Sequence, residues 1–152
     1  PEGIAGQHID TLARQYLWQH GYDFDHGTGH GVGSYLNVHE GPHGIAKGYN
    51  NVPLREGMVV SNEPGYYREN EFGIRIENLI YVKVIKEIDG IKLLGFDNLT
   101  FVPIDKRLMD LSMLTKLEKN WINNYHKEVL KKIGIYLEGS ALEWLKNASK
   151  PI

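Results

Sequence analysis

Histidine and glutamate residues in glycine-rich surroundings are the part of this sequence best suited to chemistry. His26 and His30 lie in a run in which every second residue from Gly27 to Gly33 is glycine. The other candidates are His39, Glu63 and Glu77. Glycine allows the backbone to adopt dihedral angles closed to other residues and to lie against a ligand. Imidazole nitrogens and carboxylate oxygens gathered in such segments predict a metal site or an acid–base site.

The spacing of His26 and His30 excludes two common motifs. A helical pair of metal ligands would need these histidines on one helix face, but Gly27 and Gly29 disfavour a helix and the glutamate of the zinc-protease motif is absent. The same run fails as a phosphate-binding loop, because it lacks the third glycine of the dinucleotide pattern and no Gly-Lys-Ser/Thr follows. A bend between loop and strand must therefore position these histidines.

Each candidate residue also has a plain structural interpretation. His30 alone would be a hydrogen-bonded structural histidine, Glu63 a salt-bridge partner, and Glu77 a partner of Arg75. His43 is interpreted as a turn residue, and the histidines assigned to helices are interpreted as surface or packing groups: His8, His20 and His126. From the residues alone, metal ligation and structural roles both stay open for His30. If the carboxylates do act together, oxygen and nitrogen ligands without thiolate suit a pair of Mn, Co, Zn or Fe ions.

Composition narrows the class of partner. The chain has 152 residues, about one domain, with 17 basic and 19 acidic residues and a formal net charge of -2. No basic stripe stands out, so neither a nucleic acid nor a membrane surface is predicted as partner. The absence of cysteine excludes disulfides and thiolate chemistry. Because the chain starts at Pro1 without methionine or a signal-type apolar run, we expect it to begin inside a longer protein.

Hydrophobic periodicity predicts a helix, then a β-rich segment, then helices. Residues 6–20 carry an apolar stripe at helical spacing, expected to pack onto a sheet: Ile9, Leu12, Ala13, Tyr16 and Leu17. Strands are predicted at 34–39, 58–63, 73–84, 91–94 and 99–102, with a tight turn at Asp89-Gly90. The segment after Pro103 is helical, with a stripe at Leu114, Leu117, Trp121 and Tyr125 and a capping box from Ser140 to Glu143.

Strand alternation predicts where the carboxylates point. Along residues 74–80 it sends Arg75 and Glu77 to one face of the strand. The opposite face carries the expected core layer of Ile74, Ile76 and Ile80. The strand at 58–63 presents Glu63 on one of its faces in the same way, so two strands that face one cavity would bring both carboxylates together.

Three segments closely resemble a known family. Residues 26–42, 63–67 and 72–78 resemble the aminopeptidase P group of the pita-bread metallopeptidases, in particular the long cytosolic type. The tail at 123–126, 142–145 and 151–152 resembles the C-terminal extension of that type. The resemblance implies an α+β pita-bread fold of which residues 1–103 form only the second half of the catalytic domain, with residues 104–152 as a helical C-terminal extension.

The resemblance also implies an activity and roles for residues. It implies removal of the N-terminal residue from Xaa-Pro peptides by a hydroxide that bridges two divalent metal ions, usually manganese. His30, Glu63 and Glu77 match the metal ligands, with Glu77 bridging both ions and Glu63 also acting as general base. The remaining matches are His26 and His39 in the substrate site, His39 donating to the carbonyl oxygen of the scissile bond, and Arg75 fixing a ligand carboxylate.

Part of the implied site is missing from the sequence. Two aspartates and a further histidine of the family pattern precede the segment present here, so the chain carries three of five metal ligands and is expected to be inactive alone. The resemblance further implies a cytoplasmic homodimer as the whole protein. Two alternatives stay open: a non-catalytic pita-bread homologue that serves as a binding module, and creatinase-type hydrolysis of a small guanidino compound.

Overall fold

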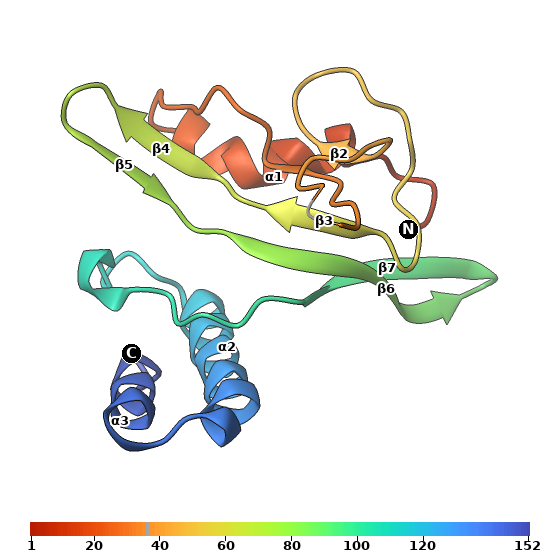
Figure 1. Ribbon diagram of the computed structural model, residues 1–152. Helices are drawn as coiled ribbons and strands as arrows, with labels where there is room; N and C mark the ends of the chain where they lie inside the picture. Colours follow the sequence, from red (N-terminus) through yellow and green to blue (C-terminus); the bar gives the residue numbers. More distant parts are fainter. Residues whose placement is uncertain (36) are drawn as a thin grey trace. The chain divides into compact units, whose positions relative to one another are not determined.

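The computed structural model describes residues 1–35 and 37–152, which form two compact units, Pro1–Thr100 and Phe101–Ile152 (Figure 1). The first unit contains α1 (Gly6–Trp18), β1 (Gly29–His30), β2 (Gly44–Ile45), β3 (Val59–Asn62), β4 (Gly65–Arg68), β5 (Phe72–Arg75), β6 (Asn78–Ile88) and β7 (Ile91–Asn98). The second contains a short 3-10 helix, η1 (Lys106–Leu108), then α2 (Lys116–Ile133), a second 3-10 helix, η2 (Gly134–Tyr136), and α3 (Gly139–Ala148). In the part of the chain that is described, no helix combines the length and apolar character needed to cross a membrane.

The described strands of the first unit form three small antiparallel sheets. They are β3-β6-β7, β1-β2 and β4-β5. The hydrophobic core lies on the first sheet and is made by Val60, Ile80 and Val82 with Ile45 and Leu54. β6 and β7 join through Asp89 and Gly90, both with positive φ (52° and 78°), as the turn of a tight hairpin requires. The predicted hairpin at these two residues is confirmed.

The strand predicted at 73–84 is divided. β5 ends at Arg75 and pairs with β4, whereas β6 begins at Asn78 and pairs with β3. Pro64 lies between β3 and β4. Because proline has no N–H to give to a ladder, the pairing is interrupted at this point on both paired segments. The isoleucine layer predicted from alternation is therefore wrong in part. Ile80 is buried, but Ile74 and Ile76 are 41% and 48% exposed.

Two further strand predictions are wrong. Residues 34, 35 and 37–39 are not in a strand, and residue 36 lies outside the described residues. The chain turns there, with Tyr35 at a φ of 51°, which does not suit a ladder. Residues 99–102 are not in a strand either. Beyond the pair of Asn98 with Ile80, the backbone N–H of Leu79 donates to the side-chain hydroxyl of Thr100 at 2.9 Å, and the regular ladder ends there.

Helix α1 forms where it was predicted but buries a different face. It ends at Trp18, so His20 lies in the turn that follows. The fully buried residues are Gly6, Asp10 and Arg14, whereas the predicted apolar stripe leaves Leu12 and Tyr16 63% and 62% exposed. The predicted apolar face is wrong in part: Ile9 packs against the hydrophobic core, but the most buried positions include charged residues, whose burial is compensated by their ion pair and by hydrogen bonds, described below.

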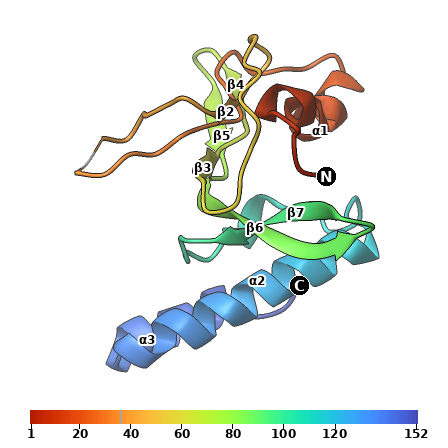
Figure 2. The ribbon, with the colours of Figure 1, turned by 90° about the vertical axis from the view of Figure 1, so that its right-hand side faces the viewer.

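The second unit packs two helices against each other. The ribbons of α2 and α3 lie next to each other in both views (Figure 2). Tyr125 and Val129 from α2 and Leu145 from α3 form the core of the unit. The predicted stripe holds only at Tyr125, since Leu117 and Trp121 are 81% and 54% exposed. The capping box predicted at Ser140 is also wrong: α3 begins at Gly139, so Ser140 lies inside the helix. The capping box is found at the start of α2, between Thr115 and Glu118.

Candidate active site

Strands β1 and β3 bring His30 and Glu63 together. The Nε2 atom of His30 lies 2.9 Å from Oε1 of Glu63, whose side chain is largely buried. Ser61, fully buried in β3, joins the two: its Oγ accepts from the backbone N–H of His30 at 2.9 Å and donates to Oε1 of Glu63 at 2.9 Å. A neighbouring bridge between Gly31 and Val60 continues the contact of the two strands. The imidazole and the carboxylate are therefore fixed by backbone pairing.

Close backbone approach explains part of the glycine run. A Cβ on Gly29 would lie 1.9 Å from the carbonyl oxygen of Ser61, and one on Gly31 would lie 2.0 Å from that of Glu40. Both distances are shorter than any non-bonded contact, so only glycine fits at these two positions. These two glycines are thus required for bringing His30 to Glu63.

The orientation of the His30 ring suits a metal ligand. Its Nδ1 lies 2.9 Å from the carbonyl oxygen of Gly31, which can only accept, so Nδ1 carries the hydrogen in the neutral ring. The lone pair of Nε2 then faces the carboxylate of Glu63, an arrangement that either a proton or a metal cation satisfies. Metal-binding histidines usually donate their other ring N–H in this way. Two of the three predicted ligands therefore fit a divalent ion.

Arg75 holds the other oxygen of Glu63. Its Nη1 lies 3.1 Å from Oε2 of Glu63, and its guanidinium lies 6.0 Å from the ring centre of Tyr67. The electrostatic interaction with Tyr67 and a hydrogen bond to it, followed by the hydrogen bond to Glu63, raise the pKa of Arg75. The plain salt-bridge interpretation of Glu63 therefore also describes this structure. The pairing of Arg75 that was considered for Glu77 is made with Glu63 instead.

Glu77 lies in the break between β5 and β6, with an exposed side chain. Asn62 pairs with Asn78 before the break and Gly65 pairs with Arg75 after it, in one register, so Glu63 and Glu77 occupy opposite positions across the break. The described residues nevertheless include no group of three histidine, aspartate or glutamate side chains able to hold a metal ion. The structure thus joins His30 to Glu63 but leaves Glu77 apart from them.

The two other predicted histidines lie beside this pair. The ring of His39, which is exposed, is 4.1 Å from the ring of His30. His26 places Nδ1 2.7 Å from the carbonyl oxygen of Gly27 and Nε2 2.7 Å from the hydroxyl of Tyr67. Because the carbonyl only accepts, Nδ1 is the donor and Tyr67 donates to Nε2 in the neutral ring. His26, Tyr67, Arg75 and Glu63 therefore form one continuous chain of contacts.

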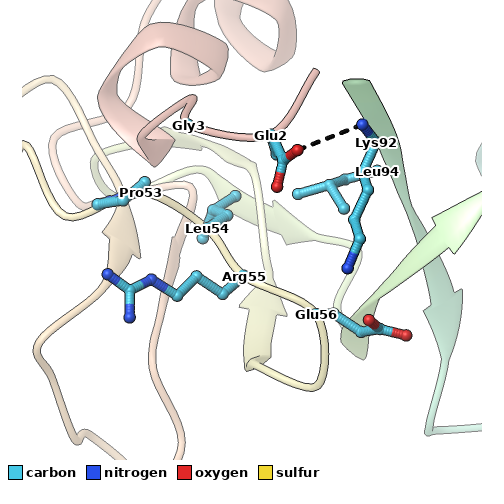
Figure 3. Close-up of a pocket in the computed structure, with 8 residues that line it drawn as sticks. All are labelled: Glu2, Gly3, Pro53, Leu54, Arg55, Glu56, Lys92 and Leu94. Atoms are coloured by element: carbon cyan, nitrogen blue, oxygen red, sulfur yellow. Dashed lines mark hydrogen bonds between the residues drawn. The ribbon is translucent and has the colours of Figure 1, made fainter. Parts of the chain in front are cut away.

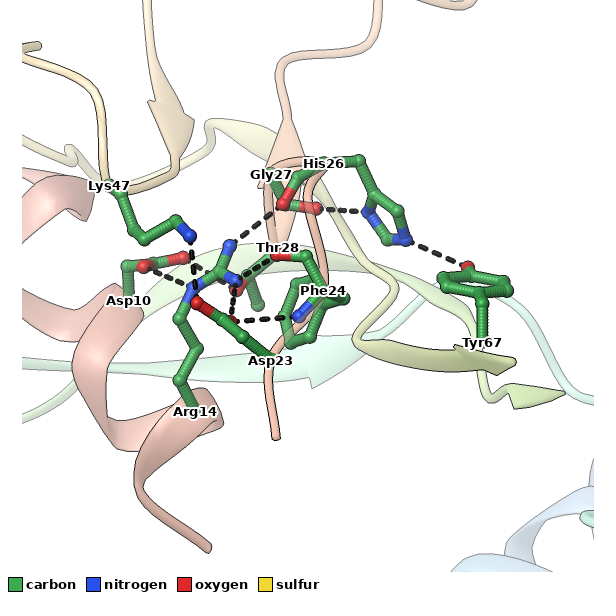
Figure 4. A network of polar contacts seen from close by, with 9 residues as sticks. All are labelled: Asp10, Arg14, Asp23, Phe24, His26, Gly27, Thr28, Lys47 and Tyr67. Atoms are coloured by element: carbon green, nitrogen blue, oxygen red, sulfur yellow. Dashed lines mark hydrogen bonds and ion pairs between the residues drawn. The ribbon is translucent and has the colours of Figure 1, made fainter. Parts of the chain in front are cut away.

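The sequence interpretation missed a buried polar network under the loop that carries His26 (Figure 4). Arg14 donates to the carboxylates of Asp10 and Asp23, and Thr28 donates to Asp10. Burial disfavours the charge on Asp23, but hydrogen bonds from Lys47, Trp18 and Arg14 outweigh it and hold its pKa well below the ordinary range. In the sequence, this network was indicated only by the spacing of Asp10 and Arg14, which lie one helical turn apart and can form an ion pair.

A separate cavity of about 440 Å³ opens on the first unit (Figure 3). Its lining residues are Glu2, Gly3, Pro53, Leu54, Arg55, Glu56, Lys92 and Leu94. The predicted site residues are not among them. Its four charged residues are all exposed, and a backbone N–H of Lys92 donates to Glu2 at 3.3 Å. The cavity therefore does not mark the predicted active site.

Comparison with known proteins identifies similar sequences and folds. Residues 1–84 match the profile described as Metallopeptidase family M24, and residues 92–152 match that of the C-terminal region of peptidase_M24. A probable Xaa-Pro aminopeptidase P of Coprinopsis cinerea is 51% identical over 100% of the chain, and Aminopeptidase P2 of Arabidopsis thaliana is 50% identical over 100%. The chain covers 26% and 22% of these relatives, about a quarter of their length.

Solved structures give the same result. The X-prolyl aminopeptidase of Caenorhabditis elegans, described as a cytosolic enzyme with a di-nuclear active site, matches 100% of this chain with a TM-score of 0.90 and 46% identity. The chain covers 25% of that protein. The X-Pro aminopeptidase of Thermotoga maritima matches 67% of this chain and is covered to 26%, with a TM-score of 0.52 and 38% identity. The predicted α+β pita-bread portion is confirmed by these matches.

Proposed function

Because the chain belongs to metallopeptidase family M24, we propose that it supplies the C-terminal part of an Xaa-Pro aminopeptidase, an enzyme that removes the N-terminal residue of peptides with proline in second position. The observation that carries the proposal is the convergence of His30 and Glu63, with the Nε2 lone pair of a correctly oriented imidazole facing a carboxylate 2.9 Å away. Simple packing does not require that arrangement.

The proposed site holds two divalent ions, with manganese as the metal, and His30, Glu63 and Glu77 as ligands. When bound, the two ions make a shared water acidic enough to act as nucleophile at neutral pH. Glu63 would accept the proton of the attacking water as general base, and Arg75 keeps the Glu63 carboxylate oriented. The position of Glu77 opposite Glu63 across the break, with an exposed side chain, supports a bridging role.

His26 and His39 act on the substrate in this proposal. His39 is exposed beside His30 and donates an N–H to the carbonyl oxygen of the scissile bond as negative charge develops there. His26 lines the site, with its ring fixed by Gly27 and Tyr67.

We further propose that the whole protein is a cytosolic homodimer. Three exposed apolar side chains on the second unit support association of two subunits: Leu117, Trp121 and Trp144. Light scattering at micromolar concentration that gives the mass of a monomer would contradict the homodimer.

A chimera tests the function directly. The quarter of the C. elegans enzyme that this chain matches is replaced by this chain, all of which is covered by the match. The chimera is expected to bind two ions per chain and to hydrolyse an Xaa-Pro peptide but not creatine, whereas the 152-residue chain alone should hold manganese weakly and be inactive. Two bound ions without hydrolysis of any peptide would favour a binding module.

Substitutions in the chimera test the ligands. Glu77→Gln is expected to lower the metal content and abolish turnover, because an amide is a weaker ligand than a carboxylate. Glu87→Gln, at an exposed position of β6, is the matched control and should leave both unchanged. Full metal content in Glu77→Gln would show that this carboxylate is not a ligand.

A further inference from the structure

Arg14 is the most completely engaged buried side chain of the first unit. It is 0% exposed, and its guanidinium makes four contacts: Nε with Asp10 at 2.7 Å, Nη1 with Asp23 at 2.6 Å and with the carbonyl oxygen of Phe24 at 2.6 Å, and Nη2 with the carbonyl oxygen of His26 at 2.7 Å. The ring of Phe24 lies 3.7 Å from the guanidinium carbon. A planar group with donors in fixed directions thus holds one helix and one loop in a single arrangement.

The contacts of Arg14 end on the backbone of the loop that carries a proposed catalytic residue. Nη2 bonds the carbonyl of His26 itself, so the guanidinium fixes the main chain from which the imidazole projects. The ring is then oriented by two further contacts, with Gly27 and with Tyr67 (Figure 4). If the main chain at His26 shifts, both of these ring contacts are disturbed.

A second branch of the network reaches Glu63. Asp10 accepts from Arg14 on one oxygen and from the hydroxyl of Thr28 on the other, at 2.6 Å. The carbonyl oxygen of Thr28 in turn accepts the backbone N–H of Glu63 at 2.7 Å. Both Asp10 and Thr28 are almost fully buried, so water does not compete for these bonds. Two residues of α1 therefore fix the main chain of two residues of the site.

We propose that Arg14 is a positioning residue for the peptidase site, which it serves by fixing His26 directly and Glu63 through Asp10 and Thr28. This inference rests on the proposed function for its catalytic consequence, but not for its structural part. Arg14 touches neither substrate nor metal, and its effect passes through hydrogen bonds to backbone. Lysine cannot replace it, because one ammonium cannot meet two carboxylates and two carbonyl oxygens in these directions.

The test begins with the 152-residue chain and Arg14→Lys. Nitrogen-detected NMR of the histidine rings reports the tautomer and the hydrogen bonds of each ring. We expect the ring signals of His26 to shift in Arg14→Lys, while those of His126, in the second unit, stay in place. Arg107→Lys is the matched control: it removes a guanidinium fork to the exposed Asp105 in the second unit and should leave His26 unchanged.

The chimera gives the catalytic readout. Arg14→Lys is expected to lower kcat about ten- to a hundred-fold with two ions still bound, since displacement of a catalytic group by about 1 Å costs up to a hundred-fold. If Arg14→Lys does not fold, Asp23→Asn carries the same prediction with a smaller shift, because it removes the charge of one partner of Arg14 and leaves the pair with Asp10. Unchanged His26 signals in the folded variant would overturn the inference. If the His26 signals shift in Arg14→Lys but the unsubstituted chimera hydrolyses no peptide, the inference about Arg14 stands and only the proposed function is contradicted.

Discussion

Gly29 lies against Ser61 so closely that a side-chain carbon would stand 1.9 Å from the serine carbonyl oxygen. This contact sets the distance between β1 and β3, and with it the distance between His30 and Glu63. It also separates two meanings of a glycine in a motif. At this position the residue is required by the neighbouring strand, whereas Gly48 faces open space.

Gly29→Ala is predicted to destabilise the first unit by about 2 kcal/mol or more, because a methyl group forced against backbone moves one strand away from the other. Urea unfolding measures this, and loss of the ring contact between His30 and His39 should accompany it. Gly48→Ala is the control, with a change in the free energy of unfolding below about 0.5 kcal/mol. Equal stabilities of the two variants would contradict the close packing of β1 on β3.

The helix caps offer a second matched pair. Thr115 accepts from the backbone N–H of Glu118, and Glu118 accepts from the backbone N–H of Thr115. Thr115→Ala is predicted to cost about 1 kcal/mol. Ser140→Ala should cost almost nothing, although Ser140 has the same spacing to Glu143, because it lies inside α3. Urea unfolding followed by the helical circular dichroism signal compares the two, and a larger loss for Ser140→Ala would refute the assignment of the cap.

His126 predicts a pH dependence of the second unit. It is fully buried and accepts from the backbone N–H of Ile104 at 3.0 Å. Burial, with the nearby charge of Lys106, lowers its pKa below the ordinary 6.5. The unfolded chain therefore takes up the proton first as the pH falls. The stability contributed by neutral His126 is complete above 6.5 and is lost as the pH falls through the lower pKa of the folded state.

Hydrogen exchange of the Ile104 amide measures this loss. Its protection, corrected for the intrinsic rate, should fall between about pH 7 and about pH 5, the range around the ordinary histidine pKa. His126→Gln should flatten the pH dependence, whereas His20→Gln, at an exposed residue, should keep it. A protection factor that does not change with pH in the unsubstituted chain would refute the role of His126.

His39 carries the prediction closest to catalysis. In the chimera, His39→Ala is expected to lower kcat by about a hundred-fold, the usual effect of removing one donor to a developing oxyanion, with metal content unchanged. His20→Ala, at an exposed histidine outside the site, is the control. Steady-state kinetics on an Xaa-Pro peptide measures kcat, and metal analysis of the same samples measures the metal content. An unchanged kcat would exclude the donor role of His39.

Local signals in the sequence predicted several elements correctly. Asp89-Gly90 demanded a hairpin, the 58–63 segment became β3, and helical periodicity located α1, because each depends on neighbouring residues. The break at Ile76 and Glu77 was not predicted, since it arises from Pro64 on the partner strand. The buried face of α1 was missed for a similar reason: Arg14 is polar, and most of the groups that compensate its burial, Asp23 and the carbonyl groups of Phe24 and His26, lie nine to twelve residues away.

The site residues show the same division. Residue type and glycine spacing singled out His30 and Glu63, and the fold brings them to 2.9 Å. The roles of His26, His39 and Glu77 came from resemblance and stay predictions. Ser61 and Tyr67 could not be selected from sequence, because a serine and a tyrosine are common in strands and only the pairing of distant segments makes them neighbours of the site.

The interruption between β5 and β6 has a thermodynamic consequence for ligand binding. Ile76 and Glu77 belong to neither ladder, so their dihedral angles can change while both sheets keep their hydrogen bonds. Fixing a backbone residue that was free costs about 1–2 kcal/mol of conformational entropy. Part of the free energy gained when Glu77 takes a ligand would therefore be spent on ordering this segment. The affinity of the site can then be tuned by the stiffness of two residues, without any change in the groups that contact the ligand.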